Sequence, residues 1–195
     1  MTAQAELFEP ATPPLPEGMR YCEDLIDAHE EAQLLEAIAA MPLAEARYKQ
    51  YTARRRVLSF GSAYDDSDRG APEALPLPDL LIPLRARLAA WAGVPAEAFA
   101  EALVAEYRPG TPLGWHRDMP AYDIVAGVSL GHAARMRLRR YPPVDVKRSE
   151  VSTLVLAPRS AYVLQGVARW GWQHSIAPTE ALRHSITFRT RRQVV

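Results

Sequence analysis

The chain has 195 residues, with 23 basic and 23 acidic side chains and a net charge of zero. This length favours one domain with a sizeable core. No apolar run reaches the about 18 residues that a membrane-spanning helix needs, so we expect no membrane contact. A single cysteine, Cys22, excludes an internal disulfide and favours a reducing cytoplasm.

The zero net charge conceals an uneven distribution along the chain. Residues 1–46 carry ten acids and one base, a net charge of −9, whereas the remaining 22 bases and 13 acids give +9. Binding to a nucleic acid needs clustered positive charge. The split leaves a basic part of the chain that could provide it.

The first predicted elements are a tail and a helix. Residues 1–19 are rich in proline and predict a disordered tail, so we place a single domain at residues 20–195. Asp27 and Glu30 have the spacing of a capping box, and the apolar residues that follow recur at helical spacing. We predict a helix that ends before Pro42.

A strand, a loop and a second helix follow. Arg54–Phe60 is typical of a strand, and Gly61–Pro78 has the Asp, Ser, Gly and Pro content of a loop. Leu80–Trp91 predicts an amphipathic helix that ends at Gly93. We therefore expect helices to be the main elements of residues 20–100.

Residues 101–195 have a different sequence pattern, in which short runs of residues that favour strands are separated by turns. The six runs are Ala102–Tyr107, Ile124–Leu130, Arg135–Tyr141, Val151–Leu156, Ala161–Leu164 and His184–Thr190. So many strands in under a hundred residues predict a mainly β fold with flanking helices (α+β), whose core is a sandwich or jelly roll. The chain has no Walker sequence and no GxGxxG before a helix, which argues against nucleotide-cofactor folds.

Three residues have the pattern of metal ligands. His116 and Asp118 are two residues apart, so an extended chain places both side chains on one side, and His174 follows 58 residues later. Two imidazoles and a carboxylate on one face of an ion are typical of ferrous oxygenases, although zinc hydrolases use similar ligands. The alternative for His116 and Asp118 alone is a local salt bridge or turn.

The last strand has a regular alternation. It puts Arg183, Ser185, Thr187 and Arg189 on one face and His184 on the other. Two arginines six residues apart lie about 20 Å apart along a straight strand, so we assign them different roles. One can pair with a carboxylate in a site, and the other can reach the metal ligands. The alternative is an amphipathic edge strand with its arginines in water.

Together these residues resemble the AlkB family of Fe(II)- and 2-oxoglutarate-dependent dioxygenases. The matching pieces are Tyr107-Arg108-Pro109-Gly110, His116-Arg117-Asp118, His174 and the strand Arg183 to Arg189, in that order. The resemblance implies a double-stranded β-helix, a jelly roll with iron at its open end. It covers residues 21 to 192 and is firmest from residue 102 onward.

The resemblance also implies roles for individual residues. The iron ligands are His116, Asp118 and His174, and the residues that bind 2-oxoglutarate are Tyr107, Arg183, Ser185 and Arg189. With Fe(II), 2-oxoglutarate and O2, such an enzyme hydroxylates a C–H bond while 2-oxoglutarate becomes succinate. When the carbon is a methyl group on nitrogen, formaldehyde is released and the amine is demethylated.

Three positions depart from the pattern of the family's repair members. Ala105 and Ser185 stand where those members usually have asparagine, and Pro120 stands where they often have an acidic residue that contacts the damaged base. We expect cosubstrate binding to survive with altered hydrogen bonds. Recognition of a base is less well supported by these residues.

The resemblance also implies that residues 20–100 include a lid over the site. Seven further residues, from this lid and from the neighbourhood of the metal ligands, are candidates for substrate contact. They are Tyr48, Tyr51, Arg54, Arg55, Arg56, Trp115 and Trp172. Aromatic rings can stack a flipped base, and arginines can hold phosphates. Arg135, Arg137 and Arg139 form a stripe on one strand face. The alternatives are buried packing for the rings and a solvated sheet face for the arginines.

Our leading hypothesis is a cytoplasmic, monomeric oxygenase that demethylates alkylated DNA or RNA. Ala105, Ser185 and Pro120 favour an alternative, the same chemistry on a protein side chain or a small molecule. A further alternative is a non-catalytic, metal-binding jelly-roll module.

Overall fold

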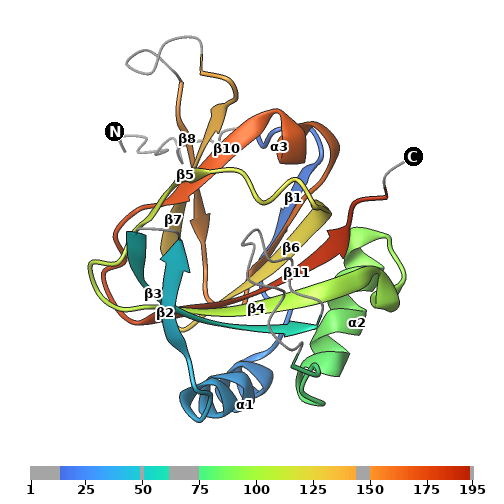
Figure 1. Cartoon of the computed structure of the whole chain (residues 1–195), viewed down its shortest axis with the longest axis vertical. Coiled ribbons are helices and arrows are strands. Elements are labelled where there is room, and N and C mark those ends of the chain that lie inside the picture. The colour runs from blue at the N-terminus through green and yellow to red at the C-terminus, as the bar shows by residue number, and fades with distance from the viewer. Residues whose placement is uncertain (1–13, 49–50, 62–74, 144–149, 194–195) are drawn as a thin grey trace, which may run out of the picture.

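Two β-sheets face each other in the computed structural model, which describes residues 14–48, 51–61, 75–143 and 150–193 (Figure 1). Among these residues, the larger sheet has seven strands in the order β1-β9-β6-β11-β4-β3-β2. The smaller sheet has four strands in the order β5-β10-β7-β8, and the pairings in both sheets are antiparallel. The structure confirms the predicted mainly β fold with a jelly-roll core.

The strands of the larger sheet are β1 (Met19–Cys22), β2 (Ala44–Tyr48), β3 (Tyr51–Gly61), β4 (Phe99–Tyr107), β6 (Tyr122–Leu130), β9 (Ala161–Leu164) and β11 (Arg183–Arg191). The strands of the smaller sheet are β5 (Leu113–His116), β7 (Ala134–Arg140), β8 (Ser152–Leu156) and β10 (Trp172–Ile176). The helices are α1 (Ala28–Ala39), α2 (Leu81–Ala92) and α3 (Gly166–Trp170), with a 3-10 turn η1 at Ala96–Ala98.

The two predicted helices form where their end signals place them. Asp27 caps α1: the backbone amide of Glu30 donates to its Oδ1 at 2.8 Å, and the Asp27 amide donates back to the Glu30 carboxylate at 3.2 Å. Helix α2 ends at Gly93, whose φ of 79° is left-handed and therefore favours glycine.

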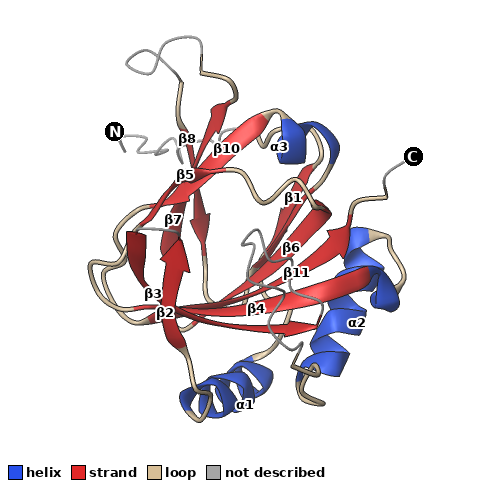
Figure 2. Cartoon of the chain, in the orientation of Figure 1, coloured by secondary structure: helices blue, strands red, loops and turns tan. Residues whose placement is uncertain are grey.

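Both helices cover the outer face of the larger sheet (Figure 2). One apolar cluster joins Leu34 and Ile38 of α1 and Leu84 and Leu88 of α2 to that face, where Phe188 of β11 is fully buried. Alternate residues of the same strands point the other way, between the two sheets. There a second cluster includes Val125, Met136, Leu138, Leu164 and Ile176.

All six predicted β runs are strands, but four further strands and α3 were missed. β1, β5 and β10 have four or five residues and lack a run of β-branched side chains, and β2 contains two alanines, an acid and a base. Such segments have little propensity of their own and become strands because a neighbour pairs with them. β1, β2 and β3 join the larger sheet, so residues 20–100 supply part of its area.

Most of the predicted tail and loop lies outside the described residues. The structure describes the tail only from residue 14, and β1 begins at Met19. Within the described part of the chain, no helix is both long enough and apolar enough to cross a membrane.

Candidate metal and cosubstrate site

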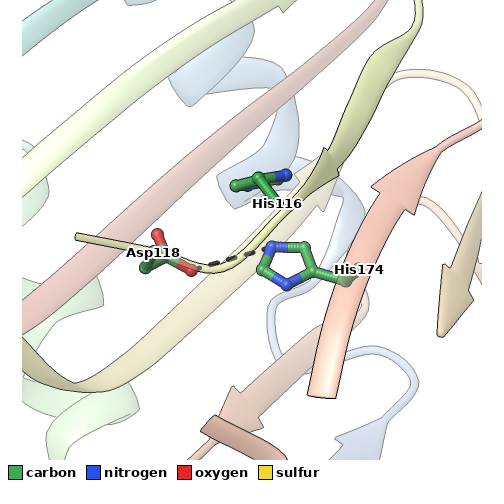
Figure 3. A group of neighbouring side chains, drawn as sticks. All are labelled: His116, Asp118 and His174. Atoms are coloured by element: carbon green, nitrogen blue, oxygen red, sulfur yellow. Dashed lines mark ion pairs between the residues drawn. The ribbon is translucent and has the colours of Figure 1, made fainter. Parts of the chain in front are cut away.

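The three predicted metal ligands come together between the sheets (Figure 3). His116 ends β5 and lies directly opposite His174 of β10, while Asp118 lies in the loop after β5. The candidate ligand atoms of the three side chains all lie within 4.8 Å of one another, and the two imidazole centroids are 4.2 Å apart. This spacing is close enough for all three side chains to bind one ion.

The two imidazoles are suited to metal binding because both are neutral at physiological pH. Burial lowers the pKa of His174 to about 3. Burial also lowers the pKa of His116, whose Nδ1 lies 2.9 Å from the Gly114 carbonyl oxygen. That oxygen can only accept, so Nδ1 carries the proton and Nε2 presents its lone pair.

The Asp118 carboxylate has one oxygen in use and one available. Its side chain is 6% exposed, and its Oδ1 accepts a 3.0 Å hydrogen bond from Nε of Arg189. Oδ2 is buried without a hydrogen-bond partner in the described part of the chain, and lies 3.7 Å from Nε2 of His174. Although burial opposes ionisation, the charge of Arg189 holds the pKa of Asp118 well below its usual range. A buried anionic oxygen without a donor is what a cation would satisfy.

The loop that carries Asp118 is held by an arginine that the sequence analysis did not single out. Arg169 of α3 is 2% exposed, and its Nη2 donates to the carbonyl oxygens of Asp118, Met119 and Tyr122 at 3.0, 2.7 and 2.8 Å. α3 also leads into β10, which carries His174. Arg169 therefore ties the loop of one candidate ligand to the segment that leads to another.

A second buried arginine marks the anion-binding part of the site. Arg183 is 2% exposed, its Nε donates to Oγ of Ser129 at 3.0 Å, and its Nη1 is buried without a partner among the described residues. Its guanidinium carbon lies 4.9 Å from the ring centroid of Tyr107, the residue paired with it on β4. A buried guanidinium with an unused donor suits a carboxylate.

Tyr107 lies among cationic and polar groups. It is 3% exposed, and although burial raises the pKa of its hydroxyl, the charges of Arg55 and Arg183 bring that pKa below its usual value. Hydrogen bonds with Arg55 and Ser185 act in the same direction. The predicted cosubstrate residues Tyr107, Arg183 and Ser185 are thus brought together.

Arg189, the other predicted cosubstrate residue, is already paired with acids. Its Nε contacts Asp118, and its Nη1 donates to Oε2 of Glu101 at 3.1 Å. These carboxylates outweigh burial and raise the pKa of the guanidinium. Arg189 therefore orients a candidate metal ligand, which is the second of the two roles that the strand alternation predicted.

Several residues of the pocket carry no recognisable sequence signal. Tyr162 of β9 lies over Gly127, where an added Cβ would be 2.7 Å from its ring. Burial, with the negative charge of Asp118, raises the pKa of Tyr162 to about 12, and its hydroxyl bonds Thr187. Ser129 and Tyr162 lie on the inner face of β6 and β9, so only the register reveals them.

The predicted substrate residues of the lid separate by strand alternation. Arg54 is exposed, whereas Arg55 is 9% exposed and contacts Tyr107 inside the pocket. Arg56 points to the opposite face, where it pairs with Glu106 at 3.1 Å and donates to a backbone carbonyl. The burial of Arg55 and the pairing of Arg56 with Glu106 therefore do not favour phosphate contacts by these two arginines.

Tyr48 and Tyr51 are partners in the backbone register of the β2–β3 pair, and their side chains lie outside the described part of the structure. The two tryptophans separate as well. Trp172 is half-buried between the sheets, on the same face of β10 as His174, so it can border the site. Trp115 lies on the opposite face from its neighbour His116, under Arg137 and Arg139, and so is not a pocket wall.

Two of the departures from the repair pattern are neighbours in the structure. Ala105 of β4 pairs directly with Ser185 of β11, so both small side chains lie side by side on the pocket floor. Pro120 is exposed in the loop after Asp118. The cosubstrate region therefore differs from the repair pattern at one spot rather than at two unrelated ones.

Comparisons with known proteins agree with this geometry. A family model described as the 2OG-Fe(II) oxygenase superfamily, where 2OG is 2-oxoglutarate, matches residues 18–192. Uncharacterized protein L905 of Acanthamoeba polyphaga mimivirus is 32% identical over 100 residues, which are 45% of this chain and 46% of that protein. The tRNA (carboxymethyluridine(34)-5-O)-methyltransferase ALKBH8 of Mus musculus is 26% identical over 173 residues, 84% of this chain and 25% of that protein. The chain thus spans less than half the length of either curated relative.

Two solved structures share the fold. The structure of OsALKBH1 superposes with a TM-score of 0.68 at 16% identity, covering 91% of this chain and all of that one. A Pseudomonas putida prolyl-4-hydroxylase superposes with a TM-score of 0.61 at 14% identity, covering 90% of this chain and 93% of that one. At sequence identities this low, the superpositions show that the fold is shared and nothing more.

Proposed function

Because the chain belongs to the 2OG-Fe(II) oxygenase superfamily, we propose that it hydroxylates N-alkyl groups and in this way demethylates alkylated bases of DNA or RNA. The chain is an AlkB-like oxidoreductase, and its cofactors are Fe(II), 2-oxoglutarate and O2. The observation that carries the proposal is a His-Asp-His cluster between the sheets, together with the buried Arg183, whose Nη1 has no partner among the described residues and can take an anion.

His116, Asp118 and His174 would hold the iron through Nε2, Oδ2 and one imidazole nitrogen, respectively. Iron and 2-oxoglutarate, when bound, would allow O2 to act as the oxidant: one oxygen atom ends in succinate, formed with CO2 from 2-oxoglutarate, and the other in the hydroxylated C–H carbon of the substrate. A hydroxymethyl group on nitrogen then breaks down to formaldehyde and the free amine.

The remaining residues of the site bind and orient. Arg183 and Tyr107 would receive the distal carboxylate of 2-oxoglutarate, because Arg183 has a buried donor in use by no other described group. Arg189 keeps Asp118 ionised and in place, and Arg169 holds its loop. Trp172 would border the opening where the substrate enters. The aligned donors and ligands need little rearrangement when the cosubstrate binds.

The name of the mouse relative places its activity on tRNA, which supports a nucleic acid as the substrate class for this chain. We expect succinate and formaldehyde in equal amounts when the Fe(II)-loaded protein is incubated with 2-oxoglutarate, O2 and N-methylated single-stranded DNA or RNA oligonucleotides. Succinate without formaldehyde on every methylated oligonucleotide would reject demethylation and leave the oxygenase assignment intact.

A second candidate is the same chemistry on a protein side chain or a small molecule. It is favoured by Pro120, which replaces an acidic residue typical of base recognition in the family, and by the adjacent Ala105 and Ser185. Stimulation of succinate release by peptides or metabolites but not by oligonucleotides would select this alternative. The family match decides against a non-catalytic module.

A further inference from the structure

The outer face of the four-stranded sheet carries arginines and no acid. Its strands β5, β7, β8 and β10 contain four arginines and no Asp or Glu. Since Leu138 pairs with His174 on the inner face, alternation places Arg135, Arg137 and Arg139 on the outer face. The sheet is therefore positive on the side away from the metal cluster.

Two of these arginines are held in fixed positions by uncharged neighbours. The guanidinium carbons of Arg139 and Arg137 lie 4.3 and 5.2 Å from the ring centroid of Trp115. Nε of Arg137 donates to Oγ of Ser175 at 3.0 Å, and Nε of Arg139 donates to Oε1 of Gln173 at 2.9 Å. These contacts orient the groups without neutralising them and leave the terminal nitrogens for an anion.

The arginines of this surface differ from several other arginines of the chain in having no acidic partner among the described residues. Arg56, Arg87, Arg159 and Arg189 each form an ion pair with a carboxylate. Within the described residues, Arg135, Arg137 and Arg139 form none. An arginine array that the fold itself does not neutralise is free to bind an external polyanion.

We propose that the surface formed by Trp115, Arg135, Arg137 and Arg139 binds the phosphate backbone of the nucleic acid strand on which the site acts. This inference rests on the proposed function, and it identifies the part of the protein surface that holds the nucleic acid. Alternate residues of β7 are spaced about 6.7 Å apart, which gives a linear array suited to a linear polyanion. β5 is an edge strand, and Trp115 directly precedes His116, so a bound strand can pass around this edge to the site.

Salt-dependent binding tests the proposal. The full chain, loaded with Fe(II) and 2-oxoglutarate without O2, is titrated into a fluorescent, unmethylated single-stranded oligonucleotide at several salt concentrations, and anisotropy gives Kd. Each arginine that contacts a phosphate contributes about 0.7 to the slope of log K against log salt. R135Q/R139Q loses two such contacts, so we expect the magnitude of its slope to be smaller than that of the wild type by about 1.4.

The control R20Q/R87Q removes the same charge from the side of the molecule that the helices cover, where Arg20 stacks on Trp91. We expect its slope to equal that of the wild type, and R139K to keep most of its slope because the charge remains. Circular dichroism melting checks that each variant is folded.

Three results would overturn the proposal: an unchanged slope in R135Q/R139Q, an equal loss in R20Q/R87Q, or wild-type binding to phosphatidylserine vesicles but not to the oligonucleotide. Formaldehyde release from methylated oligonucleotides is measured separately with the wild type. If the wild type releases formaldehyde but R135Q/R139Q keeps the wild-type slope, the proposed binding surface is rejected and the demethylation stands. If R135Q/R139Q has a reduced slope but the wild type releases no formaldehyde, the demethylation is rejected and the binding surface stands.

Discussion

At the scale of single residues, the site is organised around Asp118. Its carboxylate receives Arg189 on one oxygen and keeps the other turned toward His174. A buried carboxylate held ionised by a fixed arginine is costly to form, but it provides a ligand that needs no proton release when a cation binds. The sequence pattern predicts the ligand, and the Arg189 contact explains why it is ready.

Removing one candidate ligand should abolish metal binding at this cluster. In His174→Ala, we expect anaerobic titration with Fe(II) and 2-oxoglutarate to lose the visible metal-to-ligand absorption band, because two ligands hold the ion too weakly. His29→Ala, an exposed position on α1, serves as control and should keep the band. A full band in His174→Ala would show that the metal lies elsewhere.

Arg183 should govern the cosubstrate rather than the metal. Arg183→Ala removes a charge-assisted hydrogen-bonding group worth about 1.5 to 3 kcal/mol, so we expect the KM for 2-oxoglutarate to rise by roughly 10- to 100-fold. Fe(II) binding, measured by titration without cosubstrate, should change far less. Equal losses for both ligands would contradict the separate roles of the two arginines of β11.

At the scale of elements, α3 matters more than its five residues suggest. It places Arg169 under the loop that follows β5, and it precedes the strand that carries His174. Burial lowers the pKa of the Arg169 guanidinium, and its Nη2 donates hydrogen bonds to three backbone carbonyl oxygens. A short helix thus fixes the relative positions of ligands that are far apart in sequence.

Loosening this contact should weaken metal binding. We expect Arg169→Met to raise the Kd for Fe(II) more than tenfold, because three carbonyls lose their donor and the Asp118 loop is released. Arg56→Met is a matched control, since Arg56 pairs with Glu106 and donates to the Leu43 carbonyl on the opposite face of the larger sheet. If both variants bind Fe(II) equally, Arg169 has no special positioning role.

At the scale of the whole molecule, the fold separates its charges into layers. The helices on the larger sheet carry acids such as Glu30 and Glu31, several of them paired with arginines. Between the sheets lie the candidate metal ligands and the buried Arg183, and the charged side chains on the outer face of the smaller sheet are all arginines. The net charge of zero is thus the sum of acidic and basic regions that lie in different parts of the fold.

The stability of the fold should depend on pH through His184, which lies on the helix side of β11. Burial lowers its pKa below the usual value, even though Glu106 at 3.7 Å acts in the opposite direction. The unfolded chain therefore binds a proton more readily, and acidification from pH 7 toward pH 5 should destabilise the folded state.

Urea unfolding at pH 7 and pH 5 checks this. We expect His184→Gln to lose less unfolding free energy between the two pH values than the wild type, whatever its stability at pH 7. His29→Gln, exposed on α1, should keep the wild-type difference. An unchanged difference in His184→Gln would mean that this histidine is protonated equally in both states.

The sequence determined those features that depend on local spacing. Period-two alternation predicted the pocket face of β11, the capping box predicted the start of α1, and the order of His116, Asp118 and His174 indicated the metal chemistry. It could not tell which arginine faces a pocket, because Arg54, Arg55 and Arg56 are alike in composition and differ only in direction.

Tertiary structure alone decided the long-range pairings. The register of β4 against β11 placed Ala105 beside Ser185, and that of β6 against β9 placed Tyr162 over Gly127. Short strands such as β5 and β10 exist because a neighbour pairs with their backbone, and this pairing put Trp115 outside the pocket and His116 inside it. The alternation of residues along a strand determines which side chains share a face. The strands that pair with it determine which other residues those side chains contact.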